Sequence, residues 1–81
     1  MKSRTEVEKI VDSILIKLLR VDSEEVLTAG REKTPGWSSL MHIEIFFALE
    51  EEFGIRFDDN AMAFSDSRSE LVDAIIDAIA K

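Results

Sequence analysis

Residues 34–54, TPGWSSLMHIEIFFALEEEFG, hold a Pro-Gly turn, two adjacent serines and a long apolar run that ends at a glycine. A serine before a helix accepts a backbone N–H that the first turn leaves unpaired, and a glycine after the last apolar residue ends a helix. The stretch therefore predicts a helix that begins at Ser38 or Ser39 and ends at Phe53. A cap needs only one serine, so the second hydroxyl requires another explanation.

This predicted helix has two apolar faces. At about 100° per residue, one group of side chains falls on a broad arc that should face the protein core: Ile45, Phe46, Leu49 and Phe53. A separate apolar stripe is bordered by carboxylates; it consists of Leu40, Ile43 and Phe47, with Glu44, Glu50 and Glu51 at its edges. A three-helix core covers one face of a helix, so two interpretations of the stripe stay open. Either it is an exposed docking surface, or Phe47 fills space under a short neighbouring helix.

Two further helices are expected nearer the ends of the chain. The pairs Ser3 with Glu6 and Ser67 with Glu70 form S-x-x-E capping boxes, which predict helix starts. The first helix carries an apolar stripe at helical spacing, made of Val7, Ile10, Val11, Ile14, Leu18 and Val21. The last helix carries a second one, made of Leu71, Val72, Ile75, Ile76 and Ile79. Each stripe indicates a helix with one face in the core.

The remaining segments complete an all-α fold. Residues 22–37 lose the helical pattern and predict a long loop, with Val26 and Leu27 as its apolar anchors. A short helical turn is expected over residues 59–64, and no segment alternates long enough to predict a strand. We therefore expect one domain, residues 1–81, folded as a small bundle of three main helices plus a short fourth, with the long loop between the first two.

The composition excludes several classes of function. The chain of 81 residues has 17 acidic and 10 basic side chains and a formal charge of −7. This charge repels nucleic acids and anionic membranes and attracts basic protein surfaces. Cysteine is absent, which excludes disulfides and thiolate chemistry. No apolar run approaches the roughly 20 residues that cross a bilayer. We expect a cytoplasmic monomer that neither binds nucleic acid nor inserts into a membrane.

Catalytic and metal-binding interpretations have little support in the sequence. Ser39 and His42 are three residues apart, so on a helix they could pair as in a hydrolase. An orienting acid and an oxyanion hole are not evident, and His42 falls on the core-facing arc. Glu50, Glu51 and Glu52 point in three directions around a helix, and no calcium-loop spacing is present. A serine that carries a phosphodiester is reasonable instead, because a helix N-terminus stabilises an anion.

The stretch GWSSLMHIEIFFALEEEFGI, residues 36–55, resembles the second helix of acyl carrier proteins and related peptidyl or aminoacyl carrier domains, whose usual pattern is G-x-D-S-L followed by an apolar helix ending in ALEEEFG. The order of predicted helices is similar over essentially the whole chain. The resemblance implies that Ser39, the serine before Leu40, receives 4′-phosphopantetheine from coenzyme A through a magnesium-dependent transferase. The thiol of this group would hold an acyl or aminoacyl thioester, so the chain itself would not be an enzyme.

The resemblance also implies a partner surface on the second helix. In carrier proteins this helix is the recognition helix, so the apolar stripe and its border would meet basic surfaces of partner enzymes: Leu40, Ile43, Glu44, Phe47, Glu50 and Glu51. The partners would be the phosphopantetheinyl transferase, an acyl- or aminoacyl-loading ligase, and acyl-processing enzymes of lipid or secondary metabolism, including fatty acid biosynthesis.

Three residues depart from the family pattern. Ser38 stands where the family usually has Asp, Met41 occupies a position that is often small or acidic, and Trp37 would replace a Leu that anchors the preceding loop. The changes suggest a specialised carrier. They leave open slower modification, a dedicated transferase, or an interaction module that is never modified.

Overall fold

The fold is a bundle of helices, seen in a computed structural model that describes residues 3–80; residues 1, 2 and 81 of the expected domain lie outside the described residues. Its elements in chain order are α1 (Arg4–Leu19), the 3₁₀ helix η1 (Glu25–Thr28), α2 (Ser39–Phe53), α3 (Asp59–Phe64) and α4 (Arg68–Ala80). Within residues 3–80 there are three long helices, a short α-helix and no strands. The prediction of an all-α fold is confirmed, including the short helix over residues 59–64.

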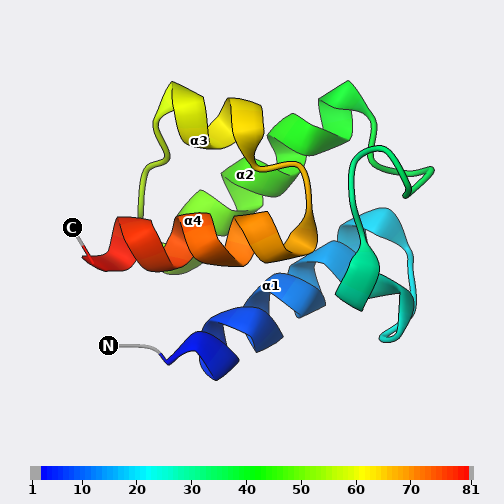
Figure 1. The fold of residues 1–81 in the computed structure, drawn as a ribbon, viewed down its shortest axis with the longest axis horizontal. Coiled ribbons are helices and arrows are strands. Elements are labelled where there is room, and N and C mark those ends of the chain that lie inside the picture. Colours follow the sequence, from blue (N-terminus) through cyan, green and yellow to red (C-terminus); the bar gives the residue numbers. More distant parts are fainter. Residues whose placement is uncertain (1–2, 81) are drawn as a thin grey trace.

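Helix α1 contacts both α2 and α4, and η1 contacts α1 and α4. Figure 1 shows α1 crossing below α4, with the short α3 on the other side of α4 and the long loop at one end of the bundle. The buried core contains residues from all three long helices and from the loop: Val7, Val11, Leu15, Leu19, Val26, Ala29, Trp37, Ile45, Phe46, Leu49, Leu71, Val72 and Ile75.

Helix α1 starts as predicted but buries a different line of residues. The Ser3 hydroxyl accepts the Glu6 N–H, and the Glu6 carboxylate accepts the Ser3 N–H, which forms the complete capping box. The buried residues are Val7, Val11, Leu15 and Leu19, which form an i, i+4 ridge. The expected stripe omitted Leu15 and Leu19, while its members Ile10, Ile14, Leu18 and Val21 are only partly buried. The prediction of this face is therefore wrong in its centre, because two neighbouring helices pack on α1 and decide which ridge is covered.

The end of α1 and the following loop also differ from expectation. Arg20 adopts the left-handed conformation at φ 58°, which ends the helix before Val21. The loop then forms η1. Just before it, the Asp22 carboxylate accepts the N–H groups of Glu25 and Glu24, and these bonds lower the pKa of Asp22. Of the two expected anchors, Val26 is buried and Leu27 is 55% exposed. Adjacent residues of a helical turn point in different directions, so only one of them reaches the core.

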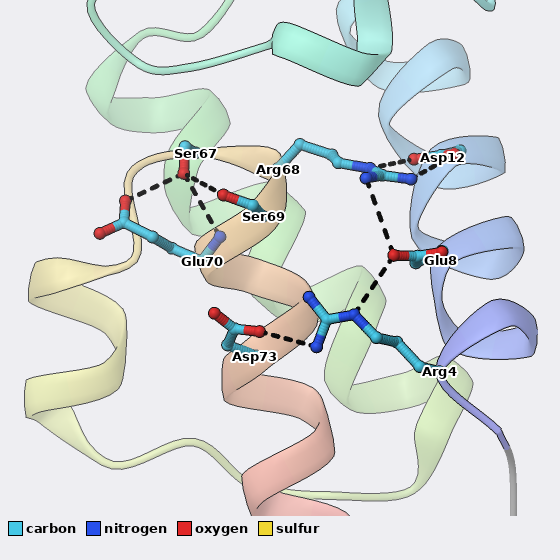
Figure 2. A network of polar contacts seen from close by, with 8 residues as sticks. All are labelled: Arg4, Glu8, Asp12, Ser67, Arg68, Ser69, Glu70 and Asp73. Atoms are coloured by element: carbon cyan, nitrogen blue, oxygen red, sulfur yellow. Dashed lines mark hydrogen bonds and ion pairs between the residues drawn. The ribbon is translucent and has the colours of Figure 1, made fainter.

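Helix α4 begins with a modified version of the predicted capping box (Figure 2). The Ser67 hydroxyl accepts the Glu70 N–H at 3.3 Å, as expected. The Glu70 carboxylate, however, accepts the N–H of Asp66 at 3.1 Å and the hydroxyl of Ser67 at 3.0 Å. Leu71, Val72 and Ile75 are fully buried as predicted.

A polar network joins α4 to α1 on the outside of the core (Figure 2). Arg68 donates two hydrogen bonds to the Asp12 carboxylate, at 2.8 and 3.0 Å, and both side chains are mostly buried. Hydrogen bonding to Asp12 raises the pKa of Arg68, although burial opposes this shift. Arg4 contacts Glu8 and Asp73 in a more exposed position. A bidentate pair shielded from water is the stronger link between the two helices.

We expect Arg68→Met to lower the free energy of unfolding by about 1–3 kcal/mol, because it leaves the Asp12 carboxylate partly buried without its donor. Arg4→Met is the matched control, since its pairs are exposed to solvent and contribute roughly 0–1 kcal/mol. Urea denaturation followed by circular dichroism measures both. Equal effects of the two substitutions would contradict the interpretation that the Arg68–Asp12 pair is the stronger link between α1 and α4.

Candidate functional site

The joint before α2 is built around Trp37. The backbone N–H of Trp37 donates to the Thr34 carbonyl at 3.0 Å, which closes the turn at Pro35. The indole is buried, and its Nε1–H donates to Nδ1 of His42 at 2.9 Å. The expectation that Trp37 anchors the loop ahead of α2 is confirmed. The last residue of the long loop is thereby fixed to the first turns of the helix.

The two serines have different surroundings. Ser38 is the N-cap of α2, with extended backbone, and its hydroxyl accepts the Met41 N–H at 3.2 Å. Ser39 is the first residue of the helix and is exposed. Its hydroxyl oxygen accepts a hydrogen bond from Nη2 of Arg31 at 3.1 Å. Ser38 therefore supplies the cap, and the hydroxyl of Ser39 is left for another role.

His42 is part of the core rather than a partner of Ser39. Its side chain is buried, and its Nε2 lies 2.7 Å from the Met62 carbonyl oxygen of α3. Because Nδ1 accepts the Trp37 N–H, the ring is the tautomer whose Nε2–H donates to Met62. Both nitrogens are used in these two bonds. Over residues 3–80 no hydrogen bond joins His42 to Ser39, which is the contact that the hydrolase alternative needs.

The apolar stripe on α2 lies on the surface. Leu40, Ile43 and Phe47 are 69%, 43% and 61% exposed. The interpretation in which Phe47 fills space under the short helix is therefore wrong; α3 packs through Met62 against the other side of α2, where His42 lies. The core-facing arc is confirmed, since Ile45, Phe46 and Leu49 are fully buried and Phe53 is partly so.

The acidic border of the stripe is not uniform. Glu44 and Glu51 are exposed, as a docking surface requires. Glu50 is partly buried, and its carboxylate accepts the Phe57 N–H at 2.9 Å, so it also fastens the segment between α2 and α3. An open hollow of about 630 Å³ lies next to Phe47 and Glu51 and extends past the C-terminal end of α2 to Arg56. Of the three carboxylates in this border, Glu44 and Glu51 are therefore the two that a partner protein can contact without breaking a bond within the fold.

Sequence reasoning missed one residue of the site. Arg31 lies in the long loop, eight positions before Ser39, and no periodicity links the two. Figure 1 shows how this loop runs beside the start of α2. An arginine in a loop without a regular pattern gives no indication in the sequence of which residue it contacts. The contact depends on how the loop folds back toward α2.

The geometry also bears on metal binding and on membrane insertion. Over residues 3–80, no group of three or more His, Asp or Glu side chains is placed to hold a metal ion. In the same part of the chain, no helix is long and apolar enough to cross a membrane.

Comparison with known proteins gave no match, either to a protein-family model or to a curated protein. The indications of function are therefore this chain's own residues and the resemblance of residues 36–55 to carrier proteins.

Proposed function

We propose that this protein is a carrier that holds an acyl or aminoacyl group as a thioester on 4′-phosphopantetheine attached to Ser39. The observation that carries the proposal is the exposed Ser39 hydroxyl at the first residue of α2, with the neighbouring hydroxyl already used as the cap. Esterification at Ser39 removes no capping bond and displaces no core side chain. The flexible arm supplies a thiol, which a chain without cysteine lacks.

The surroundings of Ser39 are suited to the phosphodiester. The first N–H groups of a helix have no partner within the helix, and they lie at the positive end of its dipole. Arg31 adds a guanidinium 3.1 Å from the oxygen. In the attachment reaction the Ser39 oxygen attacks the β-phosphorus of coenzyme A, adenosine 3′,5′-bisphosphate leaves, and the serine proton passes to a base of the transferase.

The exposed stripe supports exchange among partner enzymes. Leu40, Ile43 and Phe47 offer apolar contacts beside the arm, and Glu44 and Glu51 offer negative charge to basic surfaces. Electrostatic complementarity speeds encounter more than it strengthens a complex. Weak, fast binding suits a carrier that must visit the transferase, a loading ligase and acyl-processing enzymes in turn.

The direct test is incubation with coenzyme A, Mg²⁺ and a promiscuous phosphopantetheinyl transferase, followed by intact-mass measurement. We expect the addition of one phosphopantetheine per chain. The mass of the protein isolated from its own organism then identifies the arm and its cargo, for which fatty acyl, polyketide and aminoacyl groups are the candidates. A chain that stays unmodified in both experiments refutes the proposal.

A second candidate is an interaction module that is never modified and binds partners through the same stripe. The observation in its favour is that the stripe is exposed independently of any group on Ser39, while Ser38 replaces the acidic residue of the carrier pattern. Protein that is unmodified in its own organism and co-purifies with a partner would support this candidate.

We expect Phe47→Ala to lower the transferase kcat/KM about tenfold, because it removes the largest apolar contact of the stripe. The free energy of unfolding should change by only about 0.5 kcal/mol, since the ring is 61% exposed and surface substitutions have small effects. Phe64→Ala is the matched control, as Phe64 is 73% exposed but lies at the end of α3. An equal loss of kcat/KM in both variants would place recognition elsewhere.

A further inference from the structure

Arg31 is held in place although it belongs to the long loop. Its N–H donates to the Asp66 carbonyl at 2.8 Å, and the Arg68 N–H donates to the Ala29 carbonyl at 3.0 Å. These bonds flank the bridge between Gly30 and Ser67, which ties the loop to the start of α4. The backbone that carries Arg31 is therefore positioned by tertiary contacts before any ligand binds.

The guanidinium of Arg31 reaches two oxygens on different elements. Its Nη2 donates to the Ser39 hydroxyl at 3.1 Å, and its Nη1 lies 3.6 Å from Oδ1 of Asp66. The planar fork of arginine has donors on both sides. Asp66 lies beside one side at ion-pair distance without a hydrogen bond, and the other side donates to the oxygen that the proposed modification would esterify.

The first turn of α2 differs in charge from the chain as a whole. The protein carries a net charge of −7, yet the first turn of α2 contains no acidic residue. Where the carrier pattern has Asp, this chain has the neutral Ser38. A guanidinium gains little from a neutral hydroxyl in water, whereas its hydrogen bond to a phosphate oxygen is charge-assisted and roughly twice as strong.

We propose that Arg31 binds the phosphodiester on Ser39 and fixes the base of the prosthetic arm against the long loop. The inference rests on the proposed function, since it concerns the group attached to Ser39. Arg31 acts at the phosphate and does not touch the thioester. It is a positioning residue that sets the direction in which the arm leaves the protein.

The test is a cycle that combines modification with substitution. Wild type, Arg31→Gln, Arg31→Lys and Lys33→Gln are each prepared without and with phosphopantetheine, and the Tm is measured for every form. We expect modification to raise the Tm of wild type by about 2–4 °C more than that of Arg31→Gln. Arg31→Lys should retain part of the difference. Lys33→Gln, which removes a cation of the same loop, should behave as wild type. Higher salt should reduce the difference.

The outcomes separate this inference from the function on which it rests. If wild type stays unmodified both with the transferase and in its own organism, the carrier function fails. If addition occurs and the Tm gain is the same in all four proteins, the role of Arg31 is overturned and the carrier function stands.

If the transferase does not modify Arg31→Gln, the role of Arg31 is tested by NMR on wild type alone. The Arg31 side-chain N–H resonances are compared without and with the arm, together with their scalar coupling to ³¹P across the hydrogen bond. Unchanged resonances without coupling overturn the inference.

Discussion

Ser39→Ala is expected to abolish the addition of phosphopantetheine completely, while Ser38→Ala retains it. Both serines at the start of α2 are exposed, but only the Ser39 hydroxyl has no capping role. The Ser38 hydroxyl accepts the Met41 N–H at 3.2 Å, so its loss affects the helix. Replacing a serine N-cap by alanine costs about 0.5–2 kcal/mol, which a folded domain tolerates.

The measurement is a time course of intact mass for the two variants and wild type with coenzyme A, Mg²⁺ and transferase. Circular dichroism of each variant confirms that it is folded. Addition to Ser39→Ala together with its loss in Ser38→Ala would move the attachment site to Ser38. Addition to both variants would show that neither serine is required on its own.

The second large effect is expected in the core, where His42→Leu should lower the free energy of unfolding by about 2–4 kcal/mol. Leucine fits a buried apolar site of similar size but leaves the Trp37 indole N–H and the Met62 carbonyl without their partner. A polar group left unsatisfied in the interior costs about 1–3 kcal/mol. In a domain of this size the loss corresponds to a fall in Tm of about 10–20 °C. Thermal and urea unfolding followed by circular dichroism measure it.

A double variant isolates the hydrogen bond from the change in packing. Trp37→Phe removes the donor that His42→Leu leaves unpaired. Trp37→Phe/His42→Leu should therefore cost less than the sum of the two single substitutions. Strict additivity would mean that the 2.9 Å contact between the two rings contributes nothing to stability.

Ser39 and the Trp37–His42 pair lie in the same junction between the long loop and α2. Trp37 and His42 connect the end of the loop to α2, and His42 also binds the backbone of α3. The first turn of α2 is thus held from inside the protein, while Ser39 faces solvent on its outside. A helix start held in this way, with an exposed hydroxyl, would suit the flexible arm that we propose.

The candidate site could be predicted in part. Capping rules and helical spacing predict a helix start at Ser38 or Ser39. They also predict the buried arc containing Phe46 and the place of Glu44 at the border of the apolar stripe. Exposure of the stripe with Phe47 could not be decided, because it depends on where the short helix packs. The structural role of Glu50 was also missed, since the Phe57 N–H that it binds lies on a segment with no regular pattern.

What the sequence by itself determined are local features: where the long helices begin to within a residue or two, where α2 ends, and which arcs of α2 are apolar. Each of these depends on atoms three or four residues apart, so residue type and spacing suffice to predict it. The tertiary structure alone decided which ridge of α1 is buried, that the α2 stripe faces solvent, and that Arg31 reaches Ser39. Those features depend on contacts between segments distant along the chain, such as the bond from Arg31 to Asp66, and packing determines them only once all the helices are in place.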